Sequence, residues 1–316
     1  MRRCLLAALA LLAALPAAAQ EYPNRVIRFI VSAAPGGSND TVARVLSEAL
    51  TGQLPHPVIV ENRPGAQGML GAQAVVSAPP DGHTALLSNT GQAGLRAMAP
   101  NAPIDVATAL TPVAVLAESP MVMLVANNVP ARDLREFLAM ARAEPGRFDY
   151  ATSSGAGTLT LAALLFIKTT GLEMNAVPYR GGAPAQMDVI AGRIGVVFDV
   201  ATVALHTARA GQARAFAVSS AQRSPFAPEV PTWREMGVDA EMTVWQALWV
   251  SAATPRPIQQ ALHDAVARVL RTERFRARMA ELGADRVLDL DLDQAKAYVA
   301  AEVVRWESLL GAPPRR

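Results

Sequence analysis

The residues of greatest chemical interest lie in two short glycine turns, each between an apolar run of strand length and a segment with helical spacing. The first turn contains Gly36, Gly37 and Ser38, and Asp40 follows it. A helix that begins here leaves its first backbone N–H groups without partners inside the helix. Glycine lets a ligand approach that backbone closely, and the helix end carries a partial positive charge. The pattern therefore predicts an anion site, to which Ser38 adds a hydroxyl donor.

The second turn repeats the first in outline. Ser153, Ser154 and Gly155 follow a short apolar run, and Gly157 and Thr158 open a segment rich in leucine and alanine. Each turn could instead be only a capped helix start, with a serine or an aspartate as the N-cap residue. One turn alone supports either interpretation, whereas two turns in corresponding positions favour binding.

The composition of the turns narrows the class of anion. A P-loop needs a lysine after its last glycine, and neither turn has one. Residues 35–38 do not match the dinucleotide fingerprint, and residues 155–157 lack its third glycine. Because neither turn contributes a cationic side chain, a singly charged carboxylate suits it better than a polyphosphate.

Three further residues are candidates for ligand contact. Asn89 and Asp199 each end an apolar run, and Trp245 lies where the chain passes back between its two halves. Each also has a structural interpretation. Asn89 is a common turn residue, Asp199 could cap the helix that follows it, and Trp245 could pack in a hinge.

The sequence contains no recognisable catalytic motif. The four histidines form no H-E-x-x-H pattern and no pair with metal-ligand spacing, and no G-x-S-x-G elbow is present. A paired-carboxylate mechanism stays open, because nothing in the sequence selects a pair. We expect a protein that is not an enzyme and that holds no metal and no cofactor.

The amino-terminal segment has the pattern of a secretory signal peptide. Arg2 and Arg3 precede an apolar run that begins at Cys4, and three alanines end the segment at Ala19. Cleavage after Ala19 predicts an exported, periplasmic protein without cysteine. The net charge of the whole chain is +2, and loss of the two arginines leaves it close to neutral, which argues against nucleic-acid binding. No later apolar run is long enough to predict membrane insertion.

The order of the elements predicts an α/β fold of two lobes. Strand-like runs alternate with helical segments, which is typical of mainly parallel sheets flanked by helices. The pattern restarts near residue 121 and returns near residue 244, so we expect a double-crossover hinge. The expected units are a signal peptide at 1–19, a first lobe at 20–121 plus 245–316, and a second lobe at 122–244. The ligand should lie in a cleft between the lobes of a monomer.

Individual elements follow from the same periodicity. We expect strands at 26–32, 57–61, 84–88, 121–126, 195–199, 213–219 and 243–251. The main helices are expected at 131–143, 258–282 and 293–310.

Five short motifs, taken in order, resemble those of the Bug (TctC-like) periplasmic solute receptors of tripartite tricarboxylate transporters. They are PGGSND at 35–40, ENRPGA at 61–66, PDGHT at 80–84, VPYRGG at 177–182, and PT with EMG at 231–237. The resemblance implies a Venus-flytrap receptor that captures a small carboxylate such as a dicarboxylate, tricarboxylate, amino acid or aromatic acid. Permease subunits in the membrane are its implied partners. A sensor that signals to a membrane protein is the alternative function, followed by a hydrolase.

The resemblance also implies a site. The ligand carboxylate is expected at the loops 36–40 and 153–158, and Asp199 is expected to contact the far end of the ligand. Gly195 stands where the family commonly has an acidic residue, which leaves the specificity at that position open. His83 replaces a usual tyrosine and is not expected to reach the ligand.

Overall fold

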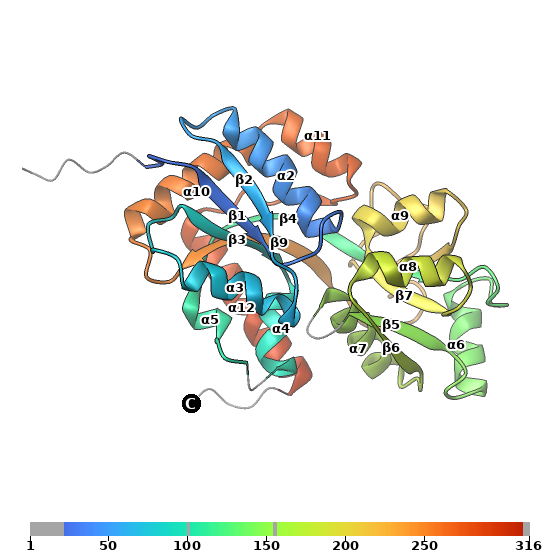
Figure 1. Cartoon of the computed structure of the whole chain (residues 1–316). Coiled ribbons are helices and arrows are strands. Elements are labelled where there is room, and N and C mark those ends of the chain that lie inside the picture. The colour runs from blue at the N-terminus through green and yellow to red at the C-terminus, as the bar shows by residue number, and fades with distance from the viewer. Residues whose placement is uncertain (1–21, 100–101, 154–156, 312–316) are drawn as a thin grey trace, which may run out of the picture.

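The computed structural model describes residues 22–99, 102–153 and 157–311, and it shows two lobes side by side (Figure 1). Three parallel strands form the centre of the first lobe: β1 (Ile27–Val31), β2 (Val58–Asn62) and β3 (Thr84–Asn89). Three further parallel strands form the centre of the second: β5 (Asp149–Ser153), β6 (Asn175–Tyr179) and β7 (Val196–Val200).

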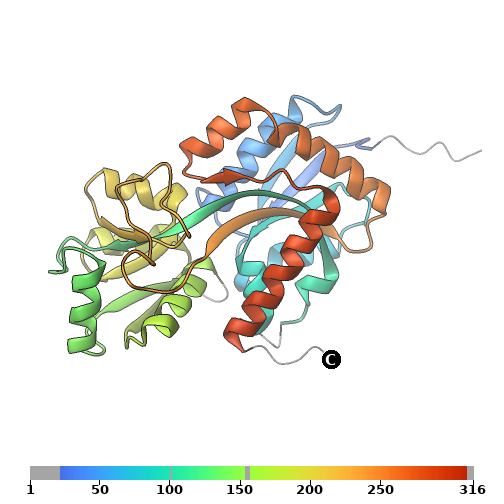
Figure 2. The same ribbon diagram turned by 180° about the vertical axis from the view of Figure 1, so that it is seen from behind.

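Two long strands pass between the lobes. They are β4 (Leu110–Val125) and β9 (Thr243–Ser251), which pair in antiparallel fashion. The second part of β4 leaves β9 and pairs with β7 and β8 (Arg214–Val218). The strand order β2-β1-β3-β9-β4-β7-β5-β6 is therefore continuous through both lobes. Figure 2 shows the two crossover strands running together from one lobe to the other.

Helices cover both faces of the sheet in the first lobe (Figure 1). On one face lie α2 (Ser38–Thr51), α10 (Arg256–Leu270) and α11 (Glu273–Glu281), whose apolar side chains share one core cluster. The other face carries η1 (Ala66–Gly68), α3 (Met69–Val76), α4 (Gly91–Met98), α5 (Val106–Ala109) and α12 (Leu292–Leu310). The short strand β10 (Arg286–Val287) pairs with β4.

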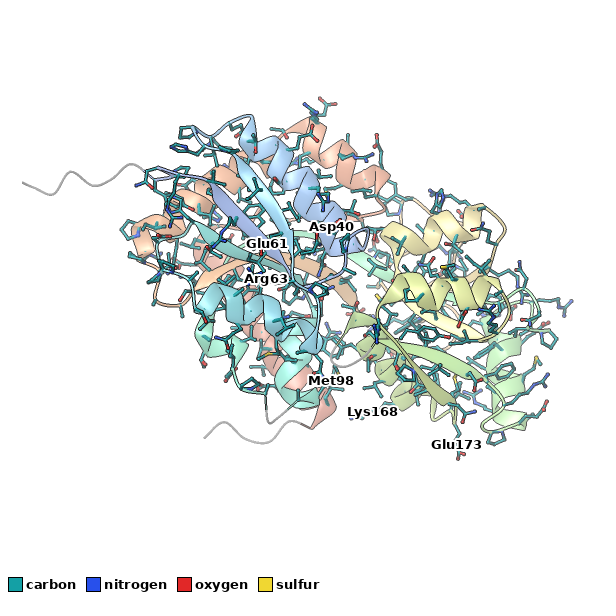
Figure 3. All side chains as sticks on the ribbon, in the orientation of Figure 1. Asp40, Glu61, Arg63, Met98, Lys168 and Glu173 are labelled. Carbon is teal, nitrogen blue, oxygen red and sulfur yellow. The ribbon has the colours of Figure 1, made fainter. Side chains whose placement is uncertain are left out.

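The second lobe is flanked by four helices of the described chain: α6 (Leu134–Ala143), α7 (Thr158–Thr170), α8 (Gly182–Ile190) and α9 (Ala201–Arg209). A hydrogen bond joins α7 to the first lobe, because Lys168 Nζ donates to the Leu309 carbonyl of α12 over 2.7 Å. In Figure 3, Lys168 lies on the side of the second lobe that faces the first. None of the helices within the described residues is both long enough and apolar enough to cross a membrane.

The structure confirms the two-lobed fold and corrects two elements. The strand expected at 121–126 is the last part of β4, and Pro112, Glu118 and Pro120 interrupt the apolar pattern of the part before it. The helix expected at 258–282 is two helices, since Thr272 begins a new one by accepting a hydrogen bond from the Phe275 N–H. The lobe boundaries stay predictions, and the expected signal peptide lies outside the described residues.

Candidate functional site

Both glycine turns follow the carboxyl end of a parallel strand and lead directly into a helix, as expected. The first joins β1 to α2, and the second joins β5 to α7. Figure 1 shows the amino-terminal ends of α2 and α7 at the junction of the two lobes. This is the position at which open α/β sheets bind ligands.

Contacts across α4 link the surroundings of the two turns. A Cβ atom on Gly94 of α4 would lie 2.9 Å from Leu161 Cδ2 of α7, so these helices touch across the lobes. Two residues earlier in α4, Gln92 lies beside the chain that leaves β1: a Cβ atom on Gly68 would be 2.6 Å from Gln92 Nε2 and 3.3 Å from Ser32 Cβ. Both turns therefore border one region of the molecule.

The donors of the first turn differ from those expected. The Gly36 N–H donates to Asp40 Oδ2 over 2.9 Å, and the Gly37 N–H to the Ala34 carbonyl over 3.4 Å. Within the described residues, no hydrogen bond is formed by the backbone N–H groups of Ser38, Asn39 and Asp40. The free donors are thus those of the first turn of α2, and the two glycines shape the approach to them.

Asp40 is held inside the first turn by its own hydrogen bonds, and its expected contact with the ligand stays a prediction. Its two oxygens accept hydrogen bonds from Gly36 N, Arg44 Nε and Asn62 Nδ2. Burial alone would raise the pKa of Asp40, but these hydrogen bonds outweigh that effect and hold the pKa below its usual value. Figure 3 shows Asp40 at the end of α2 nearest the second lobe.

Ser38 is the first residue of α2, and its hydroxyl does not cap the helix. The N-cap residue is Gly37, which forms no side-chain cap, so the capped-helix interpretation does not hold for this turn. Ser38 Oγ instead accepts a hydrogen bond of 3.2 Å from Gln246 Nε2 in the crossover strand β9.

The second turn is described only in part, because Ser154 and Gly155 lie outside the described residues. Gly157 is the N-cap residue of α7 and forms no side-chain cap. Ser153 Oγ lies 3.2 Å from Thr160 Oγ1, and a Cβ atom on Gly157 would come within 1.9 Å of the same Ser153 oxygen. Only glycine fits at 157 without displacing Ser153.

Within the described residues, the start of α7 has unpaired backbone donors like those of α2. The backbone N–H groups of Thr158, Leu159 and Thr160 have no hydrogen-bond partner among the residues that the structure describes. The Thr158 side chain is buried. The first turn of α7 contains no acidic residue, so no fixed negative charge opposes an anion there.

Asp199 lies at the carboxyl end of β7, and both of its oxygens have partners inside the lobe. Gln186 Nε2 donates to one oxygen over 2.7 Å, and the Val200 N–H donates to the other over 2.8 Å. Thr207 Oγ1 in turn donates to Gln186 Oε1. Burial raises the pKa of Asp199 to about 6, and the two hydrogen bonds only partly oppose this rise.

Two other expected contacts have clear structural positions. Asn89 is half-buried, and its Oδ1 accepts a hydrogen bond from the Gly91 N–H at the start of α4. Trp245 is fully buried and donates from Nε1 to Glu302 Oε2 of α12. Its ring packs on the opposite face of the sheet from α2, against Tyr298 of α12, and its expected contact with the ligand stays a prediction.

Two positions singled out by the family resemblance lie away from the turns. Gly195 precedes β7 and so sits at the amino end of that strand, where its carbonyl accepts from Ala126 N. The missing acidic residue therefore cannot act at the carboxyl end. His83 is buried before β3, beside Asp81 and Tyr22, also at the far end of its strand.

Gln246 joins the first turn to the crossover strand β9, and it was not predicted from the sequence. A single amide within the apolar run 244–250 was the only available signal. The alternation of strand side chains separates Gln246, which faces α2, from Trp245, which faces α12.

The described residues contain no group of three His, Cys, Asp or Glu side chains that could hold a metal. His263 is buried against the Val113 carbonyl, and His83 bonds to Asp81. Among the described residues, no histidine is hydrogen-bonded to Ser38 or Ser153.

The fold and the paired strand-to-helix turns define the class of periplasmic solute-binding proteins. Residues 42–312 match the model of the family described as "Tripartite tricarboxylate transporter family receptor", TctC. The chain belongs to this family of solute-binding receptors.

Individual relatives agree with this membership. Protein BugT of Bordetella pertussis is 32% identical over 94% of this chain and 92% of its own length. The structure of R. palustris Rpa4515 with adipate superposes with a TM-score of 0.87 at 29% identity, covering 93% of this chain and all of the other. MatC of Rhodopseudomonas palustris with bound malate gives a TM-score of 0.84 at 30% identity, covering 92% of this chain and all of the other.

Proposed function

We propose that this protein is a periplasmic receptor that captures a small carboxylate between its lobes and delivers it to the permease of a tripartite tricarboxylate transporter. The observation that carries the proposal is the pair of helix starts, on α2 and α7, whose backbone N–H groups have no partner among the described residues. Two such ends together offer roughly one unit of positive charge, which matches a single carboxylate group.

The ligands of two similar proteins support the same class of solute. Rpa4515 was solved with adipate and MatC with malate, and both ligands are short dicarboxylates. Binding and release are sufficient for this role, so we assign no catalytic step. We also assign residues 1–19 as a cleaved signal peptide, which predicts an exported protein whose first residue is Gln20.

Thermal unfolding with added ligands tests the proposal. The exported protein is stripped of bound solute and mixed with monocarboxylates, dicarboxylates, tricarboxylates, amino acids and aromatic acids. An acid at a hundred times its Kd should stabilise the protein by about 2.7 kcal/mol. Adipate and 1,6-hexanediol form a matched pair, since they share a carbon chain and differ in the carboxylates. A protein that no acid stabilises would contradict the proposal.

Delivery to a permease is tested separately in cells. Cells that lack this protein should lose uptake of the acid that binds it, and a plasmid-borne copy should restore uptake. Unchanged uptake would contradict the transport role while leaving carboxylate binding in place.

A further inference from the structure

Gln246 occupies a position in β9 where the strand pattern calls for an apolar side chain. It lies opposite Asn89 of β3 and Ala117 of β4, in the middle of the sheet. Leu248 and Val250 follow on the same face and belong to the apolar core beneath α2 and α10. The Gln246 side chain is fully buried, with an exposed fraction of 0%.

The side-chain amide of Gln246 destabilises the fold. Gln246 Oε1 is buried and has no hydrogen-bond partner among the described residues, and an unsatisfied buried acceptor lowers the stability of a fold. A leucine would fill similar space without that cost. What the amide contributes is the hydrogen bond from Nε2 to Ser38 Oγ, across 208 residues of sequence.

That hydrogen bond sets the direction of the Ser38 hydroxyl. A serine hydroxyl has one hydrogen to donate and two lone pairs that accept. When Ser38 Oγ accepts from Gln246, its own hydrogen is left to point elsewhere. The free N–H groups of Ser38, Asn39 and Asp40 lie in the same turn, so the hydroxyl becomes a further donor of one anion-binding group.

We propose that Gln246 is a positioning residue for ligand binding. It acts through Ser38, whose hydroxyl it holds as a hydrogen-bond donor to the carboxylate at the start of α2. This inference rests on the proposed function, because it needs a carboxylate at that place.

A double-mutant cycle tests the inference by titration calorimetry with adipate and malate as probes. If the wild type binds neither, the probe is the acid of the panel that it does bind. Gln246→Leu and Ser38→Ala should each raise Kd about tenfold. The double variant should bind no more weakly than Ser38→Ala alone, because Gln246 acts only through that hydroxyl. Without ligand, Gln246→Leu should unfold at an equal or higher urea concentration, since the unpaired carbonyl is gone.

A matched control tests whether the loss of any buried glutamine amide would weaken ligand binding. Gln259 of α10 is also buried, and its amide bonds to the Thr254 carbonyl and to Lys296. Gln259→Leu should leave Kd unchanged.

Two results would overturn this inference and leave the proposed function standing. They are an unchanged Kd in Gln246→Leu, or additive losses of affinity in the double variant while the wild type binds normally. A wild type that binds no acid of the panel would overturn the proposed function, and this inference with it.

Discussion

The two turns are alike in sequence and position, yet they offer an anion different surroundings. The first turn holds a carboxylate of its own, because Asp40 accepts the Gly36 N–H and lies in the first turn of α2. The second has no acidic residue in the first turn of α7, and its side chains form a hydroxyl pair between Ser153 and Thr160. The start of α7 should therefore attract an anion more strongly than the start of α2.

Each lobe also keeps one nearly inaccessible aspartate at this edge of its sheet. Asp40 and Asp199 are both 3% exposed, but their pKa values move in opposite directions. Arg44 pairs with Asp40, whereas the partners of Asp199 within the described part of the chain are a neutral amide and a backbone N–H. Although the two side chains are equally inaccessible, the pKa of Asp40 is lowered and that of Asp199 is raised, because their partners differ.

The largest effect is expected from a side chain at Gly157. In Gly157→Ala, the new Cβ atom would meet Ser153 Oγ at 1.9 Å and Ser153 Cβ at 2.7 Å. Overpacking of this kind lowers the free energy of unfolding by about 1–3 kcal/mol, and displacement of the turn should abolish carboxylate binding. Urea unfolding and titration calorimetry measure the two effects.

Ser153 provides the control for that variant. The double variant Ser153→Gly/Gly157→Ala removes both clashing atoms, so it should recover stability relative to Gly157→Ala. If Gly157→Ala is as stable as the wild type, the close packing that distinguishes the second turn is refuted.

The first turn should respond differently to the same kind of change. Gly37 has φ −77° and ψ 168°, and a Cβ atom there meets only the Ala34 carbonyl at 3.5 Å. Gly37→Val should therefore keep its fold, while its side chain covers the donors at the start of α2 and raises Kd about a hundredfold, or about 2.7 kcal/mol. Gly52→Val, at the other end of α2, should leave Kd unchanged. Equal Kd values for both variants would show that the first turn does not bind the ligand.

Local patterns allowed the elements around the candidate site to be predicted. The strand, turn and helix around Gly37 and Gly157 follow from periodicity within short windows, so their positions at strand ends were predicted correctly. The hydrogen bond between Ser38 and Gln246 joins segments far apart in the sequence, and no local pattern encodes it. The run 244–250 is apolar on both faces, so it does not reveal which side Trp245 occupies. Pro112, Glu118 and Pro120 interrupt the apolar pattern of β4 before residue 121, so only the last part of that strand was predicted.

The contrast between the aspartates predicts a pH dependence of stability. An unfolded aspartate titrates near a pKa of about 3.9, and burial raises that of folded Asp199 to about 6. Between these values the folded state binds more protons, so stability falls as pH rises from about 4 through about 6. Asp199→Asn should remove about 1–3 kcal/mol of that fall.

Urea unfolding at pH 5 and pH 7 measures this difference between wild type and variant. Gln186 can turn its amide over to suit the asparagine, because Thr207 Oγ1 can accept as well as donate. Identical pH profiles for the two proteins would show that Asp199 titrates normally and that the two lobes do not differ in this respect.

The smallest effect concerns the charge that balances Asp40. Arg44 is largely exposed, and its Nε donates to Asp40 Oδ2 over 3.0 Å. In Arg44→Gln the negative charge of Asp40 stands unbalanced beside the donors of α2, so Kd for the carboxylate should rise about two- to fivefold at low salt. Added salt should shrink the difference, since exposed charges are screened. Arg132→Gln, which breaks the exposed pair with Glu136 on α6, should leave Kd unchanged. An equal change in both variants would mean that Arg44 acts through overall charge, and that the internal ion pair of the first turn does not shape its affinity.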